Sequence, residues 1–421
     1  MKAVAGTWSR AGRGRGRATA MRPVALTVLL LARVAGALEP AQGEAAFRAG
    51  WMEARIGTAK PAALRGEPEY HGGEPLYMEL PLGNGTNAPV IGVIDGGVGI
   101  AGRIHGIHLD VNGNNSLLDD PVFHARLERG SFPHMDPVDI QVSYADGTKR
   151  LVSVKLEFRR QHRRDTGRAF WSVACHVCQH MAGRIPLGSK NVLVGIYDSS
   201  GEKGRANGCF NDYCCDRLRI DFNGDSKLDR TTEELPLSRF LSLDGKIWLE
   251  VHADPGARNV RFKRCNPSLG ELDIRCDWPG SSTMSGGRIE LLSDDGYGFV
   301  LDMGHESVLS LPESDYRVTR AKAFLRDEDK RLWKCAFSLG GPLKVRKGGV
   351  ATLRLGGALK FRPTVNKWPR PGTGLCLFPG VTGAGGERYR NISPAQTRMQ
   401  PHVTISDVEG VVVSQGPMEY G

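Results

Sequence analysis

Asp139-Ile-Gln-Val-Ser-Tyr144 and Leu151-Val-Ser-Val-Lys-Leu-Glu-Phe158 both alternate apolar and polar side chains, and Asp146-Gly147 lies between them. Successive side chains of a β-strand point to opposite faces, so this alternation predicts two strands with one buried face and one wet face. An Asp-Gly pair between two such runs is a strong signal for a tight hairpin turn. The stretch therefore predicts an antiparallel β-hairpin.

Short segments of similar texture recur along the whole chain of 421 residues, and 54 glycines are spread among them. Many short strands with turn residues between them are typical of β-sandwiches and small barrels. We therefore expect a mainly β protein with two or three sandwich- or barrel-like domains. The clearest of the other predicted strands are 90–94, 104–109, 192–197, 217–220, 288–292 and 349–355.

The composition along the chain suggests four parts. Residues 1–38 are a leader, and residues 39–88 hold one short N-terminal helix (45–55) followed by a Pro/Gly-rich linker. Residues 89–264 form one or more β domains with Asp/Asn loops. A loop over 265–286 then separates them from a C-terminal β-sandwich-like region over 287–421.

The leader resembles a secretory signal. Basic residues precede the short apolar run Val24–Leu38, and the small residues Ala35-Gly-Ala37 lie near its end. Met21 is an alternative start for such a signal. The run is shorter than the ~20 residues that a membrane-spanning helix needs. We therefore expect a secreted or periplasmic protein without a transmembrane anchor in its mature chain, the alternative being a disordered basic arm with a buried first helix.

Most of the positive charge lies in the leader. Residues 1–36 hold seven Lys and Arg and no Asp or Glu, so removing them lowers the formal net charge from +10 to +3. A nucleic-acid-binding protein instead carries its basic charge on the folded domain. The composition therefore gives no support to nucleic-acid binding.

The strongest candidate site is the acidic loop Asp221-Phe-Asn-Gly-Asp-Ser-Lys-Leu-Asp229. Calcium takes about six to eight oxygen ligands, and alternate residues of a curled loop can point their oxygens at one ion. We expect Ca²⁺ to bind here as a structural ion. The predicted ligands are Asp221, Asn223, Asp225, the backbone carbonyl of Lys227, Asp229 and Glu233.

This loop departs from an EF-hand at two positions. Ser226 stands at position 6, where an EF-hand has glycine, and Thr232 at position 12, where it has a bidentate glutamate; Glu233 comes one residue later. A strand rather than a helix precedes the loop. The alternative is an Asx-turn hairpin whose carboxylates only accept backbone N–H groups.

A second, less acidic loop runs from Asp110 to Asp120, with Asp110, Asn112 and Asn114 at positions 1, 3 and 5. It is the second predicted calcium site. A strand ending in Asp95 precedes the Asp110 loop, and a strand ending in Asp198 precedes the Asp221 loop. This similarity indicates a weak internal repeat. A third loop, from Asp198 to Asp216, is either a plain hairpin or lends an oxygen to its neighbour.

Two stretches resemble uncharacterised exported bacterial β-rich proteins with Asp-x-Asn-Gly-Asp loops. One runs from Gly195-Ile-Tyr-Asp through Asn207-Gly-Cys-Phe-Asn-Asp to Asp216-Arg-Leu-Arg-Ile-Asp-Phe-Asn-Gly-Asp. The other is the ending, from Gly383-Ala-Gly-Gly-Glu-Arg-Tyr to Gly416-Pro-Met-Glu-Tyr-Gly421. The resemblance covers about half of the chain and implies no known activity.

Nine cysteines in an exported chain predict disulfides. Cys265 and Cys276 suggest a local bridge, and Cys175 and Cys178 suggest bridges to a second group, Cys209, Cys214 and Cys215. Alternatively Cys175, Cys178, His180 and one cysteine of the second group hold zinc. Gln179, standing where a haem-attachment motif has histidine, excludes that motif, and Gly183 and Pro186 leave no room for the helix of a redox dithiol.

No catalytic constellation stands out. The chain has no Gly-x-Ser-x-Gly elbow, and its histidines have no evident partners. We expect a non-enzymatic binding or scaffold protein with an envelope or polysaccharide partner. The alternative is a secreted hydrolase acting on carbohydrate, which needs a cleft with two carboxylates and exposed tryptophan. Trp171, Trp248 and Trp333 lie in strand-like segments and are expected in the core.

Overall fold

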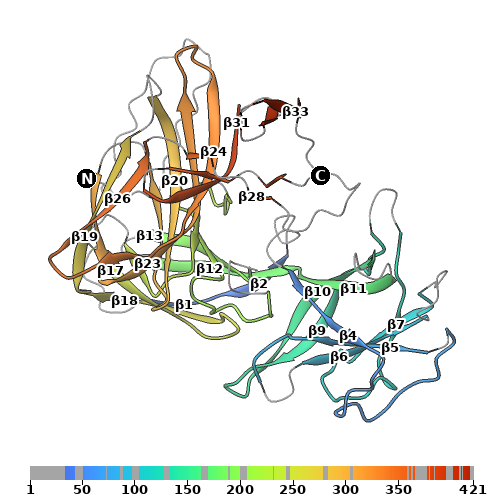
Figure 1. Ribbon diagram of the computed structural model, residues 1–421. Helices are drawn as coiled ribbons and strands as arrows, with labels where there is room; N and C mark the ends of the chain where they lie inside the picture. The colour runs from blue at the N-terminus through green and yellow to red at the C-terminus, as the bar shows by residue number, and fades with distance from the viewer. Residues whose placement is uncertain are drawn as a thin grey trace. The chain divides into compact units, whose positions relative to one another are not determined.

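In the computed structural model, every regular element of the described residues is a β-strand (Figure 1). The mainly β prediction is confirmed. These residues contain no helix that is long and apolar enough to cross a membrane. The described residues are 34–42, 51–72, 74–85, 89–96, 104–127, 132–162, 169–187, 190–199, 206–230, 232–242, 247–277, 283–303, 307–357, 360–361, 364–365, 377–378, 380–383, 385–394, 402–406, 409 and 411–417.

The described residues divide into two compact units. The N-terminal unit comprises those up to residue 266 together with 296–299, and the C-terminal unit comprises 267–295 and those from 300 onward. Each unit has its own sheets, which supports sandwich-like β architecture.

Four antiparallel sheets form the described part of the N-terminal unit. The first is β3 (Trp51–Glu53), β11 (Ala169–Val177), β10 (Lys149–His162) and β9 (Val138–Ser143). The second is β4 (Arg55–Gly57), β5 (Leu76–Leu80), β6 (Val90–Asp95), β7 (Gly106–Leu109) and β8 (Val122–Phe123). The third is β15 (Glu234–Pro236), β14 (Arg217–Ile220), β13 (Lys190–Tyr197), β12 (Gln179–Leu187) and β2 (Glu39–Gln42). The fourth is β1 (Val34–Ala37), β18 (Asn259–Cys265), β17 (Trp248–Ala253) and β16 (Phe240–Ser242).

The predicted hairpin at 139–158 is confirmed as β9 and β10. Leu151 pairs with Gln141 and Val152 with Ile140, and the turn closes through a hydrogen bond from Gly147 N to Tyr144 O of 3.0 Å. Gly147 has a φ of 81°, which glycine adopts without a steric penalty. Alternate side chains of β10 are buried, as the pattern predicts: Val152, Val154, Leu156 and Phe158.

One apolar core joins the four sheets of the N-terminal unit. Buried side chains from Leu38 to Phe262 belong to it, including Met78 of β5, Ile140 of β9 and Val194 of β13. Burying apolar area stabilises a protein by about 25 cal/mol per Å². Because the four sheets bury their apolar faces in the same core, we expect them to unfold cooperatively. The Pro/Gly-rich segment predicted as a linker contributes β5 to this core, through Leu76, Met78 and Leu80.

The predicted helix over 45–55 is not formed in its described part. Trp51–Glu53 and Arg55–Gly57 are the strands β3 and β4, while residues 43–50 lie outside the described residues. Met52 and Ala54 are buried and Glu53 and Arg55 exposed, so the burial pattern has the period of a strand. Met52 pairs with Cys175 at the edge of β11, and this pairing explains why the segment forms a strand and not a helix.

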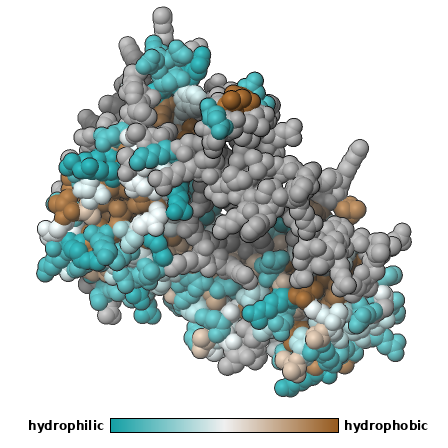
Figure 2. Space-filling model, in the orientation of Figure 1, coloured by the Kyte–Doolittle hydropathy of each residue, from teal (hydrophilic) through white to brown (hydrophobic). Residues whose placement is uncertain are grey.

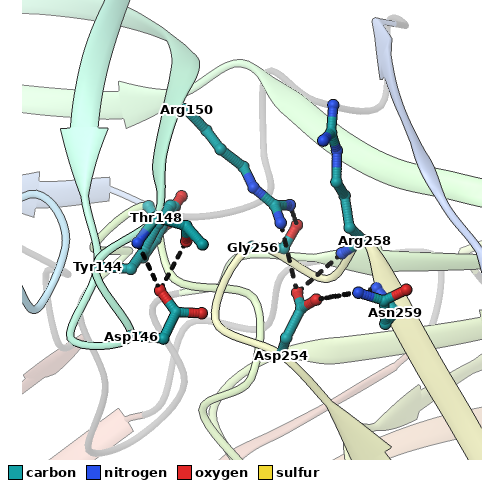
Figure 3. Close-up of polar contacts among 9 residues, drawn as sticks. Tyr144, Asp146, Thr148, Arg150, Asp254, Gly256, Arg258 and Asn259 are labelled. Atoms are coloured by element: carbon teal, nitrogen blue, oxygen red, sulfur yellow. Dashed lines mark hydrogen bonds and ion pairs between the residues drawn. The ribbon is translucent and has the colours of Figure 1, made fainter.

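Arg150 connects the β9–β10 hairpin to the turn between β17 and β18 (Figure 3). Its Nη1 donates to the Gly256 carbonyl oxygen at 2.5 Å, and its Nη2 lies 3.8 Å from Asp254. Asp254 in turn accepts the N–H groups of Arg258 and Asn259 at 2.9 and 3.0 Å. One side chain thus fixes two turns that are remote in sequence.

The C-terminal unit contains a larger sheet, a three-stranded sheet and two short hairpins in its described part. The larger sheet is β21 (Gly298–Asp302), β20 (Thr283–Ser293), β23 (Ser314–Arg326), β24 (Leu332–Leu339), β31 (Glu387–Pro394), β30 (Val381–Thr382) and β27 (Lys360–Phe361), with β25 (Leu343–Val345) paired to β23. The smaller is β22 (Ser307–Pro312), β19 (Leu269–Asp277) and β26 (Val350–Gly356). The hairpins are β28 (Thr364–Val365) with β29 (Leu377–Phe378), and β32 (His402–Ser406) with β33 (Val412–Pro417).

In this unit, a segment predicted as a loop contains a strand, and one strand pair is parallel. The loop predicted over 265–286 contains β19, whose Leu272 and Ile274 are buried on alternate positions. Strand β19 pairs parallel with β26, from Glu271 with Val350 to Asp277 with Gly356, although its other partner β22 is antiparallel. Among the coloured residues of Figure 2, hydrophobic ones gather in a few patches set among hydrophilic ones.

Candidate cation-binding loops

The Asp221 loop begins where β14 ends. Val194 of β13 pairs with Ile220 of β14, and the N–H of Asp221 donates to the Leu193 carbonyl oxygen at 2.9 Å. The base of the loop is therefore part of the sheet. Asp221 is 5% exposed, whereas Asn223, Asp225 and Asp229 are exposed.

The first seven residues curl around the Asp221 carboxylate. Its Oδ1 accepts Gly224 N at 2.7 Å and Asp225 N at 3.1 Å, and its Oδ2 accepts Ser226 N at 2.9 Å. Gly224 and Ser226 have φ values of 78° and 63°. Ser226 adopts the left-handed conformation at the position where an EF-hand uses glycine, so the substitution preserves the curl.

The side chains at positions 3 and 5 continue the pattern. Asn223 Oδ1 accepts Asp225 N at 2.8 Å, and Asp225 Oδ1 accepts Lys227 N at 2.9 Å. Asp229 Oδ1 accepts Thr232 N at 2.9 Å. These are the Asx-turn contacts that the alternative interpretation predicts, and they also hold the loop in the curled form that a cation-binding loop needs.

Glu233 closes the loop from its far end. This side chain is 3% exposed; its Oε2 accepts Asp229 N at 3.0 Å, and no hydrogen bond reaches its buried Oε1 within the described part of the chain. Burial raises its pKa, the N–H groups of Asp229 and Asn223 oppose this, and the carboxylates of Asp221 and Asp225 raise it further. The structure thus brings Glu233 next to Asp221 and Asp225 although it comes one residue late for an EF-hand.

The Asp110 loop repeats this curl. Asp110 accepts the N–H groups of Asn114 at 3.0 Å and Asn115 at 2.9 Å, and Asn112 Oδ1 accepts Asn114 N at 3.1 Å. Left-handed residues again occupy positions 4 and 6, with φ values of 71° at Gly113 and 61° at Asn115. The two loops therefore share one backbone conformation over their first six positions.

The side chains inside the Asp110 loop differ from those inside the Asp221 loop. Asn112 and Asn114 donate their amide Nδ2 atoms to Asp119 Oδ2 at 2.9 and 2.8 Å. Burial, followed by repulsion from Asp110 and Asp119, raises the pKa of Asp120 to about 6. Amide donors here occupy the inside of the curl, where a cation would need oxygens.

The repeat extends into the strands with a shift of one residue. Asp110 N donates to Ile91 O at 3.0 Å, just as Asp221 N donates to Leu193 O. With Ile91 matched to Leu193, the strand-end Asp95 corresponds to Tyr197 and not to Asp198. Asp95 is instead used locally: its two oxygens accept the N–H groups of His71 and Gly72 at 3.0 and 2.7 Å.

A buried histidine near Asp95 was not singled out by the sequence. His108 is 4% exposed and meets Tyr70 edge to face, with ring centroids 5.5 Å apart. Burial lowers its pKa, the Asp95 charge raises it and His71 lowers it. His108 lies opposite Val93 in the β6–β7 register, and this brings it near Asp95. The sequence does not reveal this proximity unless the pairing of the two strands is known.

The cysteine cluster forms no disulfide among the described residues, and Cys376 lies outside them. Cys175 and Cys178 are buried where β11 passes into β12, and burial raises the pKa of Cys178 to about 11, which disfavours a reactive thiolate. The predicted zinc set is not assembled. His180 instead stacks on Tyr197, with ring centroids 4.4 Å apart, and the Arg219 guanidinium lies 3.8 Å from the same ring.

Across the described ranges, no three His, Cys, Asp or Glu side chains converge on one metal position. A cation entering either loop must therefore draw carboxylates inward by side-chain rotation. Of the three tryptophans expected in the core, Trp248 is buried, and Trp171 and Trp333 are half-buried. Comparisons with protein-family models, curated proteins and solved structures found no match.

Proposed function

We propose that the Asp221 loop binds Ca²⁺ as a structural ion in an exported β-sheet protein with a binding or scaffold role. One observation carries the proposal. Asp221, Asp225, Asp229 and Glu233 are grouped on one curled loop, and a buried oxygen of Glu233 has no hydrogen bond within the described residues. An all-oxygen set of this charge suits a hard divalent cation.

The contrast with the Asp110 loop supports the choice of loop. Both loops share a backbone curl, but Asn112 and Asn114 point amide donors at Asp119 in the Asp110 loop. The Oδ1 atoms of Asn112, Asn114, Asn223 and Asp225 all accept backbone N–H groups, but position 5 of the Asp221 loop is Asp225, a carboxylate without an amide donor. We therefore assign the cation to the Asp221 loop and not to Asp110, Asn112 and Asn114.

Packing around the Asp221 loop suits a structural ion. Arg219 donates to Glu234 Oε2 through Nε and Nη2 at 3.0 and 2.8 Å and to the Leu228 carbonyl oxygen through Nη1 at 3.4 Å. An ion in the loop would join β14, which precedes it, to β15, which follows it. Cation binding would then stabilise the edge of this sheet.

Export supports calcium as the ion, because extracellular modules commonly bind calcium with a Kd of about 0.1–1 mM. The secretory leader, the disulfides of the 175–215 cluster and the likeness to exported bacterial proteins form part of the same proposal. Strand β1 (Val34–Ala37) pairs with β18, and Leu38 is fully buried. Sequencing the mature N-terminus tests whether cleavage removes β1 or leaves it in place.

The central test is a thermal melt of the metal-stripped protein with Ca²⁺ and with chelator. Ligand at 100 times its Kd stabilises by about 2.7 kcal/mol, which corresponds to a rise of roughly 5–10 °C in Tm. Asp225→Asn should reduce this rise, whereas Asp119→Asn in the Asp110 loop should leave it intact. An equal rise in wild type and Asp225→Asn, or no rise in wild type, would refute the assignment.

A further inference from the structure

Asp198 and Asp216 lie opposite one another just beyond the end of the β13–β14 pair. The last pair of that register is Tyr197 with Arg217, and the two aspartates are the next residues on either side. Each is 1% exposed. Residues directly opposite on antiparallel strands have Cα atoms about 4.5–5.5 Å apart, and like charges placed there are destabilising.

Backbone donors satisfy most of the oxygens of this pair. Asp198 Oδ2 accepts Asn207 N at 2.9 Å and Gly208 N at 2.5 Å. Asp216 accepts Ser199 N at 3.2 Å on Oδ1 and Asp212 N at 2.8 Å on Oδ2. The exception is Asp198 Oδ1, which is buried and receives no hydrogen bond from any described residue.

Asp212 adds a third carboxylate on the same turn. Its Oδ2 accepts the Asn207 amide Nδ2 at 2.9 Å, so Asn207 contacts both Asp198 and Asp212. Asp212 is half-buried, and a cation shared by all three carboxylates would need its side chain to rotate toward the pair. Tyr144 also holds the turn, since its hydroxyl donates to the Gly208 carbonyl oxygen at 2.8 Å.

The electrostatics of this group require a neutralising partner. Burial raises the pKa of Asp198 and of Asp216 well above the ordinary value, and the neighbouring carboxylates raise it further, while only backbone N–H groups oppose the shift. Burial also raises the pKa of the adjacent Cys209 thiol, which keeps it neutral. One proton neutralises one of three carboxylates, whereas a divalent cation neutralises two and accepts oxygens from all three.

We propose that Asp198, Asp212 and Asp216 form a second divalent-cation site, of the all-oxygen type that takes Ca²⁺, with the unpaired Oδ1 of Asp198 as its innermost ligand. This site is separate from the Asp221 loop. Strand β14 has four residues, and Asp216 and Asp221 flank it at its two ends. Cations at both ends would hold this short strand in register with β13.

The test is a Ca²⁺ titration of the full chain, stripped with chelator and followed by calorimetry and equilibrium dialysis. Wild type should bind two ions per chain. Asp225→Asn should bind one, Asp198→Asn should bind one, and the double variant should bind none. If Asp198→Asn keeps the wild-type number of ions, the inference is overturned.

The same titration separates this inference from the proposed function. If the Asp221 loop does not bind Ca²⁺, Asp225→Asn will bind as many ions as wild type, whereas Asp198→Asn will bind none. If Asp198→Asn does not fold, Asp212→Asn serves instead, since its side chain is half-buried. In chelator, Asp198→Asn should melt above wild type because repulsion is removed, and Ca²⁺ should raise its Tm by less.

A shared proton is the competing explanation of the buried pair. In that case the Asp225→Asn variant, which retains only the 198–216 cluster, would bind no Ca²⁺ at pH 7 and would show no rise in Tm. That outcome would overturn the inference. A rise in Tm of Asp225→Asn with Ca²⁺, absent from the double variant, would support it.

Discussion

Leu228, at position 8 of the Asp221 loop, packs directly over Gly195 of β13. A side chain at residue 195 would place its Cβ 2.5 Å from Leu228 Cδ1, closer than nonbonded carbons approach. The loop is thus seated on the sheet through one leucine and one glycine. This contact explains why the apolar residue at position 8 needs a glycine facing it.

Gly195→Val should displace Leu228 and loosen the loop. Overpacking of this kind costs about 1–3 kcal/mol, and the urea midpoint at constant m-value measures it. Calcium affinity should fall together with stability. Gly340→Ala is the matched control, because no atom lies within 4 Å of its added Cβ; an equal loss in both variants would contradict the packing argument.

Arg150→Ala should destabilise the N-terminal unit by about 1–3 kcal/mol, because the carbonyl of Gly256 loses a charged donor (Figure 3). The 3.8 Å ion pair with Asp254 adds little, since both side chains are partly exposed. Arg331→Ala, which removes a surface ion pair with Asp329, should change the urea midpoint by much less. Equal midpoints for Arg150→Ala and wild type would show that the two turns are not tied together.

Asn114→Asp should give the Asp110 loop a dependence on calcium. The change removes the amide donor to Asp119 and adds a carboxylate beside Asp110, so the loop should lose about 1–2 kcal/mol in chelator. Added Ca²⁺ should restore the loss. The measurement belongs in the Asp198→Asn/Asp225→Asn double variant, where neither proposed site contributes; no recovery with Ca²⁺ would mean that the shared curl does not suffice for binding.

His180 should make the protein less stable in mild acid. Burial, with the Arg219 charge, lowers its pKa from 6.5 to about 4. The unfolded chain takes up this proton below pH 6.5 and the folded chain does not, so stability present above pH 6.5 is lost as the pH falls toward 4. The loss should be about 2 kcal/mol between pH 6.5 and 4.5.

His180→Gln should flatten this part of the pH profile, as measured by urea midpoints at pH 7, 5.5 and 4.5. His252→Gln is the control, because the His252 side chain is 56% exposed. An unchanged slope in His180→Gln would mean that His180 is not held neutral by its contacts with Tyr197 and Arg219.

Local patterns predicted part of this structure well. The alternation at 139–158 predicted both strands and their buried face, and the spacing of Asp221, Asn223 and Asp225 predicted a loop whose curl the structure contains. The alternation of Leu272 and Ile274 was also present in the sequence, but the surrounding Cys, Pro and Gly residues favoured a loop.

Other features depend on pairing between distant strands, which spacing does not reveal. Met52 belongs to a strand because β11 offers an edge, although the surrounding residues favour a helix. Asp198 and Asp216 face each other only because β13 and β14 pair in one particular register across an 18-residue separation. Glu233 reaches the loop because β15 turns back along β14.

The parallel pairing of β19 with β26 implies an order of events during synthesis. The ribosome releases β19 before residues 278–349, so its β26 edge waits unpaired until that whole stretch has emerged. Chain termination or proteolysis anywhere before residue 350 would leave an unpaired, aggregation-prone strand edge on the nascent protein. A chaperone that shields this edge during translation would therefore protect the C-terminal unit from aggregation.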